Sequence, residues 1–563
     1  MRIFKFCKKY IVSDKYRVTL YIFLALLAVS IKILSPYILG NFVDYLIKGA
    51  NLGIIFKFCI IFGSLNLIRM LRDYISSMIY VKMQTKMGYH LNINIIKHIQ
   101  RLSLSFINHK NGIYLNQRVN EDSSAVISFC LDTIEGFVTN LIMLILPFIL
   151  LLRMNALITY MMLGFILAYI IIYFKIKDYL YKAGYAFRES QANFFNNLYE
   201  QLKYIKLIKL DSVQREINNR ADDSFFDYRK VAINSQRANY IYNSLDSIVS
   251  TFAQITLFVV GGIQVIDGKF TVGMFTIFSS YFNMILDSSG YFFSLGAGYQ
   301  YVLSSYNRIN NILQFDEERN GNMKLDDIYS IDIKDLSFSY DNYKCKNAKL
   351  LEEFVDIEKN ISEYIFTNFN YKFEKGNIYS IIGENGSGKS TIINLIIGLF
   401  TDEYKGKIYY NEIDISEIDM IDVRRNLIGI AEQEPLLLNN SILYNITFNE
   451  NMSVDNKSLY KYLQVLNMYK FIEENTLSFI IDEKNTNLSG GEKQKIAILK
   501  VLYKNPKVMV FDEPTSALDF KTRKKFIEYL NEIKEDKIII IITHDSVISD
   551  NTDKVLDLSN KLR

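Results

Sequence analysis

Long apolar runs occur only in the first half of the chain. A helix needs about 20 residues to cross the hydrocarbon core of a bilayer, and the runs before residue 300 reach that order of length. The second run and the last two also carry polar residues. The pattern therefore predicts a membrane domain with six spans, at 18–40, 52–80, 129–152, 155–175, 240–265 and 272–298.

Two polar segments, 81–127 and 176–238, interrupt the series of spans. Both keep apolar residues at helical spacing among Lys, Asn and Gln, which predicts helices that continue beyond the membrane. Both are rich in Lys and Arg, as is the stretch before the first span. Cytoplasmic loops carry such an excess of basic residues. We expect a multi-pass protein of the plasma membrane with its N-terminus and both long segments in the cytoplasm.

After about residue 325 the pattern changes to short apolar runs that alternate with amphipathic helices. Examples of the runs are Ile378–Ile382, Val508–Phe511 and Ile538–Ile542. Runs this apolar are typical of strands buried on both faces of a mostly parallel sheet. We therefore expect a membrane domain over 1–320 and a soluble α/β domain over 326–563.

Composition narrows the function classes. Half of the 563 residues are hydrophobic and the mean hydropathy is barely positive, which fits a membrane half joined to a soluble half. The net charge of +4, from 64 basic and 60 acidic residues, does not indicate nucleic acid as a partner. The four cysteines form no CxxC pair, so neither a disulfide framework nor a zinc cluster is indicated.

A glycine-rich segment, Gly383–Ser390 (GENGSGKS), fits the phosphate-loop pattern GxxxxGK[ST]. The predicted strand Ile378–Ile382 leads into it and a predicted helix, Lys389–Leu399, leads out. Backbone N–H groups and the helix N-terminus would face phosphates there. Lys389 can reach the β- and γ-phosphates and Ser390 can bind Mg²⁺. The plain alternative is a glycine turn capped by a helix. The candidate contacts to ATP are Gly383, Asn385, Gly386, Ser387, Gly388, Lys389, Ser390 and Thr391.

Acidic residues and a histidine follow two of the predicted strands. Asp512 and Glu513 end the run that begins at Val508. Asp512 can hold Mg²⁺, and Glu513 can polarise a water molecule for attack on the γ-phosphate. His544 follows the strand Ile538–Thr543 and is a candidate γ-phosphate contact. Taken alone, these residues would more often be surface or capping groups, and the phosphate loop favours the catalytic interpretation.

The segment Leu488–Glu492 (LSGGE) precedes a predicted helix, Lys493–Leu502. Ser489, Gly490 and Gly491 offer donors at a second helix N-terminus, which is another anion site, and Glu492 completes the segment. One domain cannot easily bring two helix N-termini so distant in sequence onto one γ-phosphate. Two domains arranged head to tail can do so, and the segment therefore predicts a dimer.

Together these segments resemble the nucleotide-binding domain of an ABC transporter. The resemblance covers the Walker A loop (383–390), the signature (488–492), Walker B (508–513), the D-loop Ser516–Asp519 and the switch histidine His544. It implies ATP and Mg²⁺ as cofactors. It further implies that Gln433 is the Q-loop residue that touches Mg²⁺, that Tyr340 stacks on adenine, and that Glu483 is the X-loop glutamate. Three departures from the family pattern are an apparent insertion at 341–365, the replacement of glycines by Asp482 and Asn485, and the expected absence or reduction of the C-terminal helices, since nineteen positions follow His544.

The membrane half resembles ABC exporters. Leu104–Phe106 with Gly112, Arg118 and Asp122 follows the first intracellular loop of that family. Glu200–Leu202 with Ile208 and Lys209 resembles the second intracellular loop, and Arg308–Leu313 resembles the helix that leads to the ATPase. The resemblance implies a half-transporter with a six-helix membrane domain fused to one nucleotide-binding domain.

These observations predict an ATP-driven transporter, which exports a peptide or a hydrophobic compound by alternating access. Its expected partners are a second copy of the chain or a related half-transporter, the lipid bilayer and the cargo. An ATP-gated channel or regulator and an importer remain alternatives. A soluble ABC ATPase that acts on DNA or ribosomes would lack the spans. Charged residues in the spans contact the cargo, lie at span ends in water or pair with one another; they are Arg69, Arg72, Asp73, Asp246 and Asp287.

Overall fold

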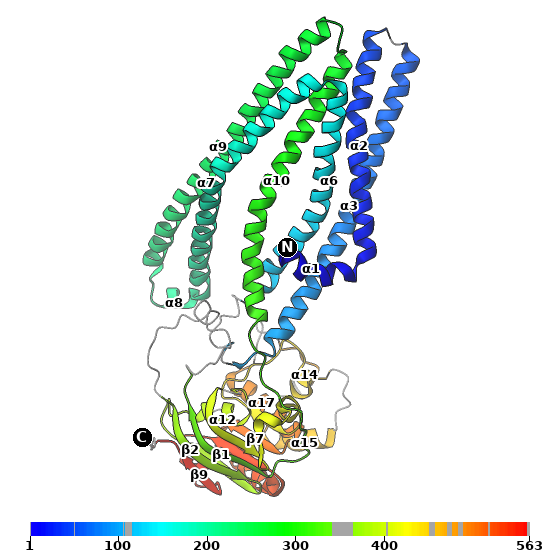
Figure 1. The fold of residues 1–563 in the computed structure, drawn as a ribbon. Coiled ribbons are helices and arrows are strands. Elements are labelled where there is room, and N and C mark those ends of the chain that lie inside the picture. The colour runs from blue at the N-terminus through cyan, green and yellow to red at the C-terminus, as the bar shows by residue number, and fades with distance from the viewer. Residues whose placement is uncertain are drawn as a thin grey trace. The chain divides into compact units, whose positions relative to one another are not determined.

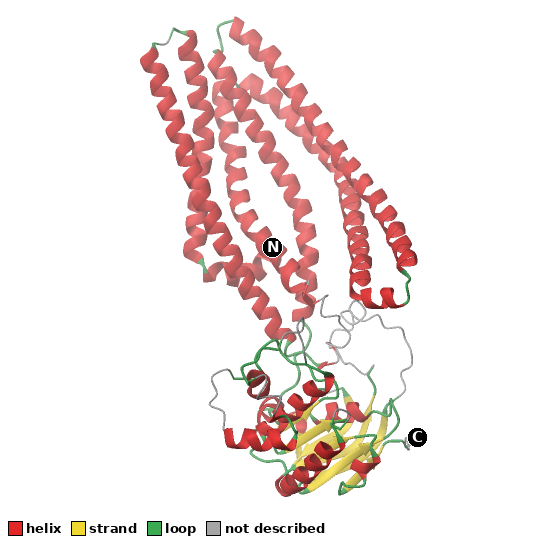
Figure 2. Ribbon diagram, turned by 180° about the vertical axis from the view of Figure 1, so that it is seen from behind, coloured by secondary structure: helices red, strands yellow, loops and turns green. Residues whose placement is uncertain are grey.

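The computed structural model describes residues 2–49, 51–104, 106, 115–116, 118–340, 364–400, 403–449, 456–469, 476–481, 488–515 and 518–559. The chain forms two compact units. The first consists of Met1–Ile96 with Asn116–Ile312, and the second of Lys97–Leu115 with Leu313–Arg563. In the described residues the first unit is helical and the strands belong to the second (Figures 1 and 2).

The helices of the first unit are much longer than a bilayer requires. A helix of 48 residues extends about 70 Å, against a hydrocarbon core of about 30 Å. Two helices have that length and α9 has 53 residues. The polar segments 81–127 and 176–238 are thus largely helical in their described residues, as expected. The elements are α1 (Arg2–Ser13), α2 (Lys15–Ile47), α3 (Leu52–Ile99), η1 (Arg118–Asp122), α6 (Ser123–Met154), α7 (Ala156–Lys203), α8 (Ile205–Leu210), α9 (Gln214–Ile266) and α10 (Val272–Leu313).

Within the part of the chain that the structure describes, five helical segments are long and apolar enough to cross a membrane, and they coincide with the first five predicted spans. The sixth predicted span, 272–298, lies in α10, which is not among these five. That span stays a prediction. The five segments are Lys15–Ile47, Leu52–Ile99, Arg118–Met154, Ala156–Lys203 and Gln214–Ile266.

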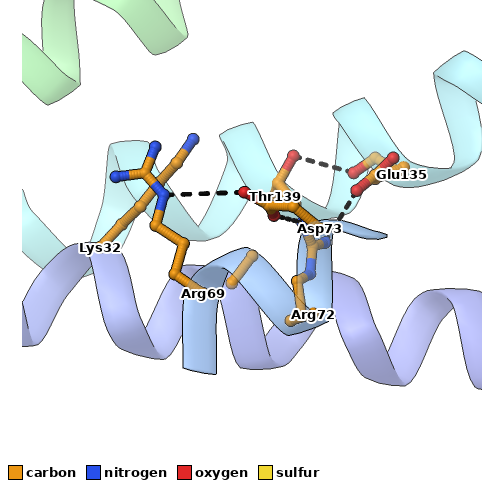
Figure 3. Close-up of a pocket in the computed structure, with 7 residues that line it drawn as sticks. Lys32, Arg69, Arg72, Asp73, Glu135 and Thr139 are labelled. Atoms are coloured by element: carbon orange, nitrogen blue, oxygen red, sulfur yellow. Dashed lines mark hydrogen bonds and ion pairs between the residues drawn. The ribbon is translucent and has the colours of Figure 1, made fainter. Parts of the chain in front are cut away.

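Charged residues hold three of these helices together. Arg72 of α3 donates its Nε–H to the Leu24 carbonyl of α2 at 2.8 Å and pairs with Glu135 of α6 at 2.9 Å. The same guanidinium pairs with Asp73 at 2.8 Å (Figure 3). Of the charged candidates in the spans, Arg72 and Asp73 therefore pair with each other.

Helices α2 and α10 approach closely at two glycines. The N-terminus of α10 is capped by Asp44, whose Oδ1 accepts from Gly273 N at 2.7 Å and whose Oδ2 accepts from the Thr271 hydroxyl at 2.6 Å. A Cβ atom on Gly273 would lie 2.1 Å from the Gly40 carbonyl oxygen. Only a residue without a side chain fits this crossing.

The second unit contains a sheet of parallel strands, as predicted, and the described strands in it number five. The order is β6-β7-β8-β3-β9, and all four pairings are parallel. All five residues of β8 are buried, which explains its uninterrupted isoleucines. The strands are β6 (Ile428–Ala431), β7 (Val508–Asp512), β8 (Ile538–Ile542), β3 (Asn377–Ile382) and β9 (Lys554–Asp557).

A second, antiparallel sheet has the order β2-β1-β4-β5. Its β1 carries positive φ at Asp335 and irregular register on both sides. The sequence pattern does not reveal this sheet, because its strands alternate polar and apolar residues rather than forming apolar runs. The strands are β1 (Ser330–Phe338), β2 (Phe366–Glu374), β4 (Tyr404–Tyr410) and β5 (Ile413–Asp414).

Two predicted helix boundaries in this unit are wrong. The helix after the phosphate loop, α12 (Lys389–Ile396), ends before Leu399 because the chain turns at Gly398, whose φ is 72°. The helix predicted to begin at Lys493, α17 (Gly490–Lys504), begins three residues earlier. A capping box of Ser489 and Glu492 fixes that start. The other helices are α13 (Met420–Asn426), α14 (Ile442–Thr447), α15 (Asn456–Val465), α18 (Phe520–Ile533) and α19 (Ser546–Ser549), with 3-10 turns η2 (Ile415–Glu417) and η3 (Lys534–Asp536).

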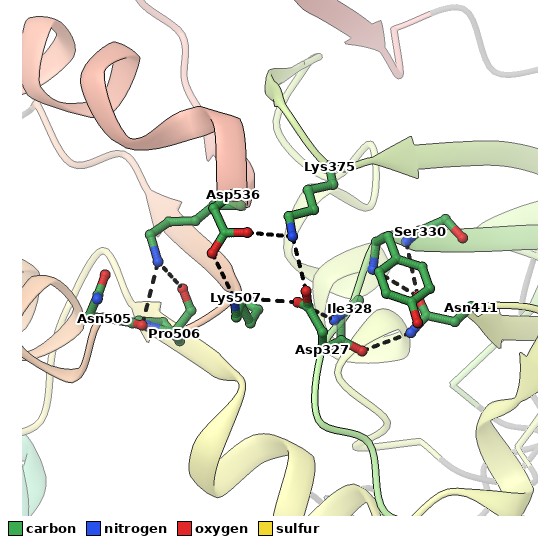
Figure 4. Close-up of polar contacts among 11 residues, drawn as sticks. Asp327, Ile328, Ser330, Lys375, Asn411, Asn505, Pro506, Lys507 and Asp536 are labelled. Carbon is green, nitrogen blue, oxygen red and sulfur yellow. Dashed lines mark hydrogen bonds and ion pairs between the residues drawn. The ribbon is translucent and has the colours of Figure 1, made fainter.

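An ion-pair network joins the segment just before β1 to the N-terminal edge of the parallel sheet (Figure 4). Lys375 pairs with Asp327 at 3.0 Å and with Asp536, and Lys507 pairs with Asp536 at 2.6 Å. Hydrogen bonds from Lys375 and Lys507 lower the pKa of Asp536 to about 2. The network links four segments that are far apart in sequence.

We expect the wild-type chain in detergent to lose thermal stability as the pH falls from about 4 to about 2. A depressed carboxylate pKa stabilises the fold above its unfolded value of 3.8 and loses that contribution as it protonates. Asp536→Asn should reduce the pH dependence of the unfolding temperature over this range. Its effect on the unfolding temperature at pH 7 should be small, because the side chain is largely exposed. Unfolding temperatures across the range check this. Equal pH slopes for Asp536→Asn and the exposed control Asp550→Asn would contradict it.

Substitution of Gly273 by Ala should lower the unfolding temperature of the solubilised protein by about 5 °C or more, because the new Cβ overlaps Gly40. The matched control is Gly262→Ala in α9, where nothing lies within 4 Å of the added carbon. A thermal-shift comparison of the two variants measures the difference. Indistinguishable variants would show that α2 and α10 do not need the close crossing.

Candidate functional site

The phosphate loop connects the carboxyl end of β3 to α12. Gly386 and Gly388 have φ of 83° and 97°, which side chains other than glycine rarely adopt. A Cβ on Gly388 would lie 2.7 Å from the side chains of Ile365 and Phe366. The loop is closed by a hydrogen bond from Ser387 N to the Glu384 carbonyl at 3.1 Å. The glycines are therefore needed for the shape of the loop itself.

Two polar groups of this loop are turned into it. Lys389 is 9% exposed, and its ammonium donates to the carbonyls of Gly383 at 2.7 Å and Glu384 at 3.0 Å. The Ser387 hydroxyl oxygen is buried and has no hydrogen-bond partner within the described residues. A lysine held only by carbonyls and an unsatisfied hydroxyl suit the oxygen atoms of a phosphate chain. Asn385 is exposed in the same loop.

Tyr340 lies beside the helix that follows the loop. Its hydroxyl is 2.8 Å from the Thr391 hydroxyl, and its ring packs edge-on against Phe338 and Phe400. The side chain is 40% exposed. An aromatic ring that is fixed on one side and open on the other is suited to stacking on a base.

Asp512 meets the phosphate loop because β7 and β3 both pair with β8. Ser390 Oγ donates to Asp512 Oδ2 at 3.4 Å. Burial and then the charge of Glu513 raise the pKa of Asp512, which indicates a carboxylate that a cation would stabilise. No cluster of three His, Cys, Asp or Glu side chains suited to a metal occurs among the described residues. Mg²⁺ in proteins commonly takes one or two protein oxygens and completes its shell with phosphate and water, so Ser390 and Asp512 fit this ion.

Glu513 is the centre of a polar cluster. Its Oε2 accepts from Gln433 Nε2 at 2.8 Å, and its Oε1 lies 3.4 Å from His544 Nε2. The residue has a φ of 45°, a left-handed conformation that is strained for a residue with a side chain. Its N–H donates to the Ile542 carbonyl at 2.9 Å. The fold thus brings Gln433, Glu513 and His544 together, and an acid held in this way is placed to take a proton.

Gln494 is a residue of this site that the sequence analysis missed. It is only 3% exposed, and its Nε2 donates to the Glu513 carbonyl at 2.7 Å. It therefore ties the helix that begins at the signature segment, Leu488–Glu492, to the strained end of β7. The sequence held one signal for this role: Gln494 is a polar residue on the buried, otherwise apolar face of the helix that includes Ile496 and Ala497.

The signature segment is not brought to the phosphate loop of its own chain by any hydrogen bond among the described residues. Ser489 Oγ caps the backbone N–H of Glu492, and Glu492 accepts from Ser489 N at 2.6 Å. A Cβ on Gly490 would meet nothing within 4 Å, and its φ is not in the left-handed range. The glycine pair Gly490–Gly491 is thus not explained by packing around Gly490.

The end of α3 packs within the second unit. Arg101 and His98 contact the Glu317 carboxylate at 3.5 and 3.2 Å, and the Arg101 carbonyl accepts from Glu318 N at 2.6 Å. Phe106 packs against Phe315, and Leu104 packs on the hydrophobic core of the unit. The first intracellular segment therefore contacts the linker that enters its own α/β domain.

The polar extensions of the first unit contain a buried charge triad. Asp122 is 4% exposed, pairs with Arg118 at 2.8 Å and accepts two bonds from Arg308 at 2.5 and 3.0 Å. The triad joins the first intracellular segment to the helix that leads to the second unit. Several expected positions lie outside the described residues: Ser105, Gly112, the insertion up to residue 363, Asp482, Glu483, Asn485, Ser516, Ala517 and the side chain of Asp246.

Comparisons with known proteins agree with this arrangement. Residues 18–289 match the family model of the ABC transporter transmembrane region, and 366–516 match the ABC transporter model. The chain is 26% identical over 93% of its length to the lactococcin-G-processing and transport ATP-binding protein LagD of Lactococcus lactis, of which it covers 72%. It is 22% identical over 95% of its length to the transport/processing ATP-binding protein ComA of Streptococcus pneumoniae, of which it also covers 72%.

Two further similarities concern lipid transport and the fold. The chain is 26% identical over 66% of its length to the ATP-dependent lipid A-core flippase of Pasteurella multocida, of which it covers 62%. A solved structure of a bacterial Atm1-family ABC exporter with ATP bound superposes with a TM-score of 0.80 at 18% identity, and the match covers 98% of this chain and 94% of that chain.

Replacement of Glu513 by Gln should leave nucleotide binding intact and reduce phosphate release by about 100-fold or more, since the amide cannot accept the proton of the attacking water. Glu432→Gln is the matched control, because it removes an exposed negative charge near Asp512 without touching His544 or Gln433. Binding of a labelled ATP and release of phosphate are measured on the same preparations. Undiminished release by Glu513→Gln would exclude Glu513 as the base.

Proposed function

Because the chain belongs to the ABC transporters and is a half-transporter of the exporter type, we propose that two copies assemble head to tail and export a peptide or a hydrophobic compound by alternating access. A homodimer is the simplest assembly, and a related half-transporter is the alternative partner. The protein is an ATPase coupled to transport, embedded in a membrane through several spans. We place it in the plasma membrane with its N-terminus and α/β domain in the cytoplasm, on the basic residues before the first span.

The main support for a site shared between two chains is that the phosphate loop and the signature segment form two separate clusters within one chain. Lys389, Asp512 and Glu513 gather around the phosphate loop, whereas the signature segment makes its hydrogen bonds within its own helix start. Space around Gly490 leaves room for a close approach of another molecule. In the proposed dimer, the signature segment of one copy faces the phosphate loop of the other, and the donors at its helix N-terminus meet the γ-phosphate.

In this proposal each side chain has a role. Tyr340 stacks on adenine, while Lys389 and the donors from Gly383 to Thr391 hold the phosphates. Ser390, Gln433 and Asp512 would hold Mg²⁺, which offsets phosphate charge when bound. Glu513 takes a proton from the attacking water, and His544 contacts the γ-phosphate and steadies the carboxylate that it already lies beside.

Two segments of the membrane half would transmit the motion. The end of α3 packs in the α/β unit of its own chain. The short helix α8 exposes its apolar side chains instead, with Leu207 55% and Leu210 71% exposed. Such side chains fit a docking surface on the second copy, as the exporter resemblance implies for Ile208 and Lys209. The two long helices α7 and α9 that carry α8 would then move with the partner.

The cargo class follows from the relatives rather than from the site. LagD and ComA are named as transport and processing proteins, and LagD is named for lactococcin G. We therefore place a peptide first and a hydrophobic compound second. ATP-dependent uptake into inside-out vesicles would separate export from import, and its absence alongside ATPase activity would favour the channel or regulator.

A complementation experiment with two differently tagged copies tests the shared site. One copy carries Lys389→Ala and the other carries Ser489→Arg, and the mixed dimer is purified through both tags. One intact pair of phosphate loop and signature remains in a head-to-tail dimer, so measurable ATPase activity is expected. The control dimer combines wild type with a copy that carries both substitutions, which damages both sites and should abolish activity.

The opposite outcome would reject the proposal. If each chain completed its own site, the first mixed dimer would be inactive and the control dimer would keep the activity of its wild-type copy. Failure to purify any dimer with this chain alone would instead indicate a different half-transporter as the partner.

A further inference from the structure

A charged pocket of about 200 Å³ lies between α2, α3 and α6 of the membrane unit (Figure 3). Its positions fall inside three predicted spans, where ionised side chains are expensive and usually have a function. The ATPase mechanism uses none of them. The polar lining consists of Lys32, Arg69, Arg72, Asp73, Glu135 and Thr139.

One wall of the pocket sets the guanidinium of Arg72 against two carboxylates, those of Asp73 and Glu135. The side chain of Arg72 is only 10% exposed and is bound by Asp73, Glu135 and the Leu24 carbonyl. Glu135 also accepts a hydrogen bond from the Tyr21 hydroxyl. Thr139 donates its hydroxyl to the Glu135 carbonyl at 2.9 Å. These groups satisfy one another and hold the three helices together.

The other two cations are not matched in the same way. Arg69 is half exposed and lies 3.8 Å from Asp73, a carboxylate that Arg72 already binds at 2.8 Å. Lys32 lines the same pocket, and Figure 3 shows the ends of Lys32 and Arg69 reaching toward the same side, away from Glu135. The lining therefore holds three cations against two carboxylates. Two like charges directed to one end of a pocket in the membrane favour an anion between them.

We propose that this pocket binds the carboxylate or phosphate group of an amphiphilic cargo, with Lys32 and Arg69 as the ligands of that group. Arg69 can bind two oxygen atoms of a planar anion, and Lys32 adds a point charge. The volume suits one anionic group, so the remainder of the cargo lies outside the pocket. The inference rests on the proposed function and gives it a substrate class: an amphiphile with an anionic end.

The test uses the purified full-length chain in nanodiscs of zwitterionic phosphatidylcholine. The probes are N-lauroylglycine, its uncharged amide and dodecyl phosphate, and the readouts are stimulation of ATPase activity and the shift in unfolding temperature. Lys32→Gln and Arg69→Gln should each raise the half-maximal concentration of the two anionic probes by about tenfold, as for loss of a hydrogen bond to a charged group. The response to the amide and the basal ATPase activity should not change.

Lys57→Gln is the matched control, because it removes an exposed lysine from α3 outside the pocket. Equal responses of the pocket variants and this control would overturn the inference, as would a wild-type chain that does not distinguish N-lauroylglycine from its amide. Both outcomes leave the proposed function standing, since that depends on the mixed-dimer ATPase assay.

A second set of nanodiscs containing phosphatidylglycerol identifies the source of the anion. Lipid that occupies the pocket should abolish the response to added N-lauroylglycine in the wild type and raise the unfolding temperature of wild type above that of Arg69→Gln. That result would support anion binding but assign it to the bilayer. An unchanged response to the probe in these nanodiscs would support the cargo as the source.

Discussion

The parallel pairing of β8 with both β7 and β3 is the constraint on which the proposed catalytic site depends. It aligns Asp512 with Ile542 and Ile381 with Ile542, so the carboxyl ends of the three strands lie at one edge of the sheet. The phosphate loop, Asp512–Glu513 and His544 each follow one of these strands. Their side chains meet without further adjustment, apart from the strained backbone at Glu513. That strain is held by hydrogen bonds to Ile542 and Gln494.

In the first unit, buried ion pairs fix how the helices pack, as strand pairing does in the second unit. An arginine between helices is stable there only when its partners satisfy it. Asp122 with its two arginines and Arg72 with its two carboxylates meet that condition. Both clusters join helices that are distant in sequence, so their charges fix the packing. Lys32 and Arg69 differ, because the pairing around them is loose or incomplete, and a function is then the better explanation for keeping them.

The sequence predicted the elements that have a local signal. The phosphate loop, the parallel strands and five spans follow from glycine spacing, apolar runs and run length. The antiparallel sheet does not, because its strands are half polar and are recognised only by their partners. The same holds for Gln494, whose role depends on a carbonyl 19 positions away, and for the packing of Arg101 on Glu317. The observed helix ends at Ser489 and Gly398 differ from the predicted ones because local capping and turn geometry set them. The pattern of apolar and polar residues does not locate such ends.

The start of α17 supports the proposed assembly of two copies of the chain. Glycine in a helix costs roughly 1 kcal/mol relative to alanine, and α17 begins with two of them. The backbone at Gly490 does not require glycine, and a Cβ there would meet nothing within 4 Å in the residues that the structure describes. The capping box would form equally well with alanine at that position, because its hydrogen bonds come from Ser489 and Glu492 alone. Glycine at this position therefore lowers the stability of the helix without improving the packing around Gly490. We attribute it to the close approach of a phosphate group held by a second copy, which a side chain at this position would obstruct.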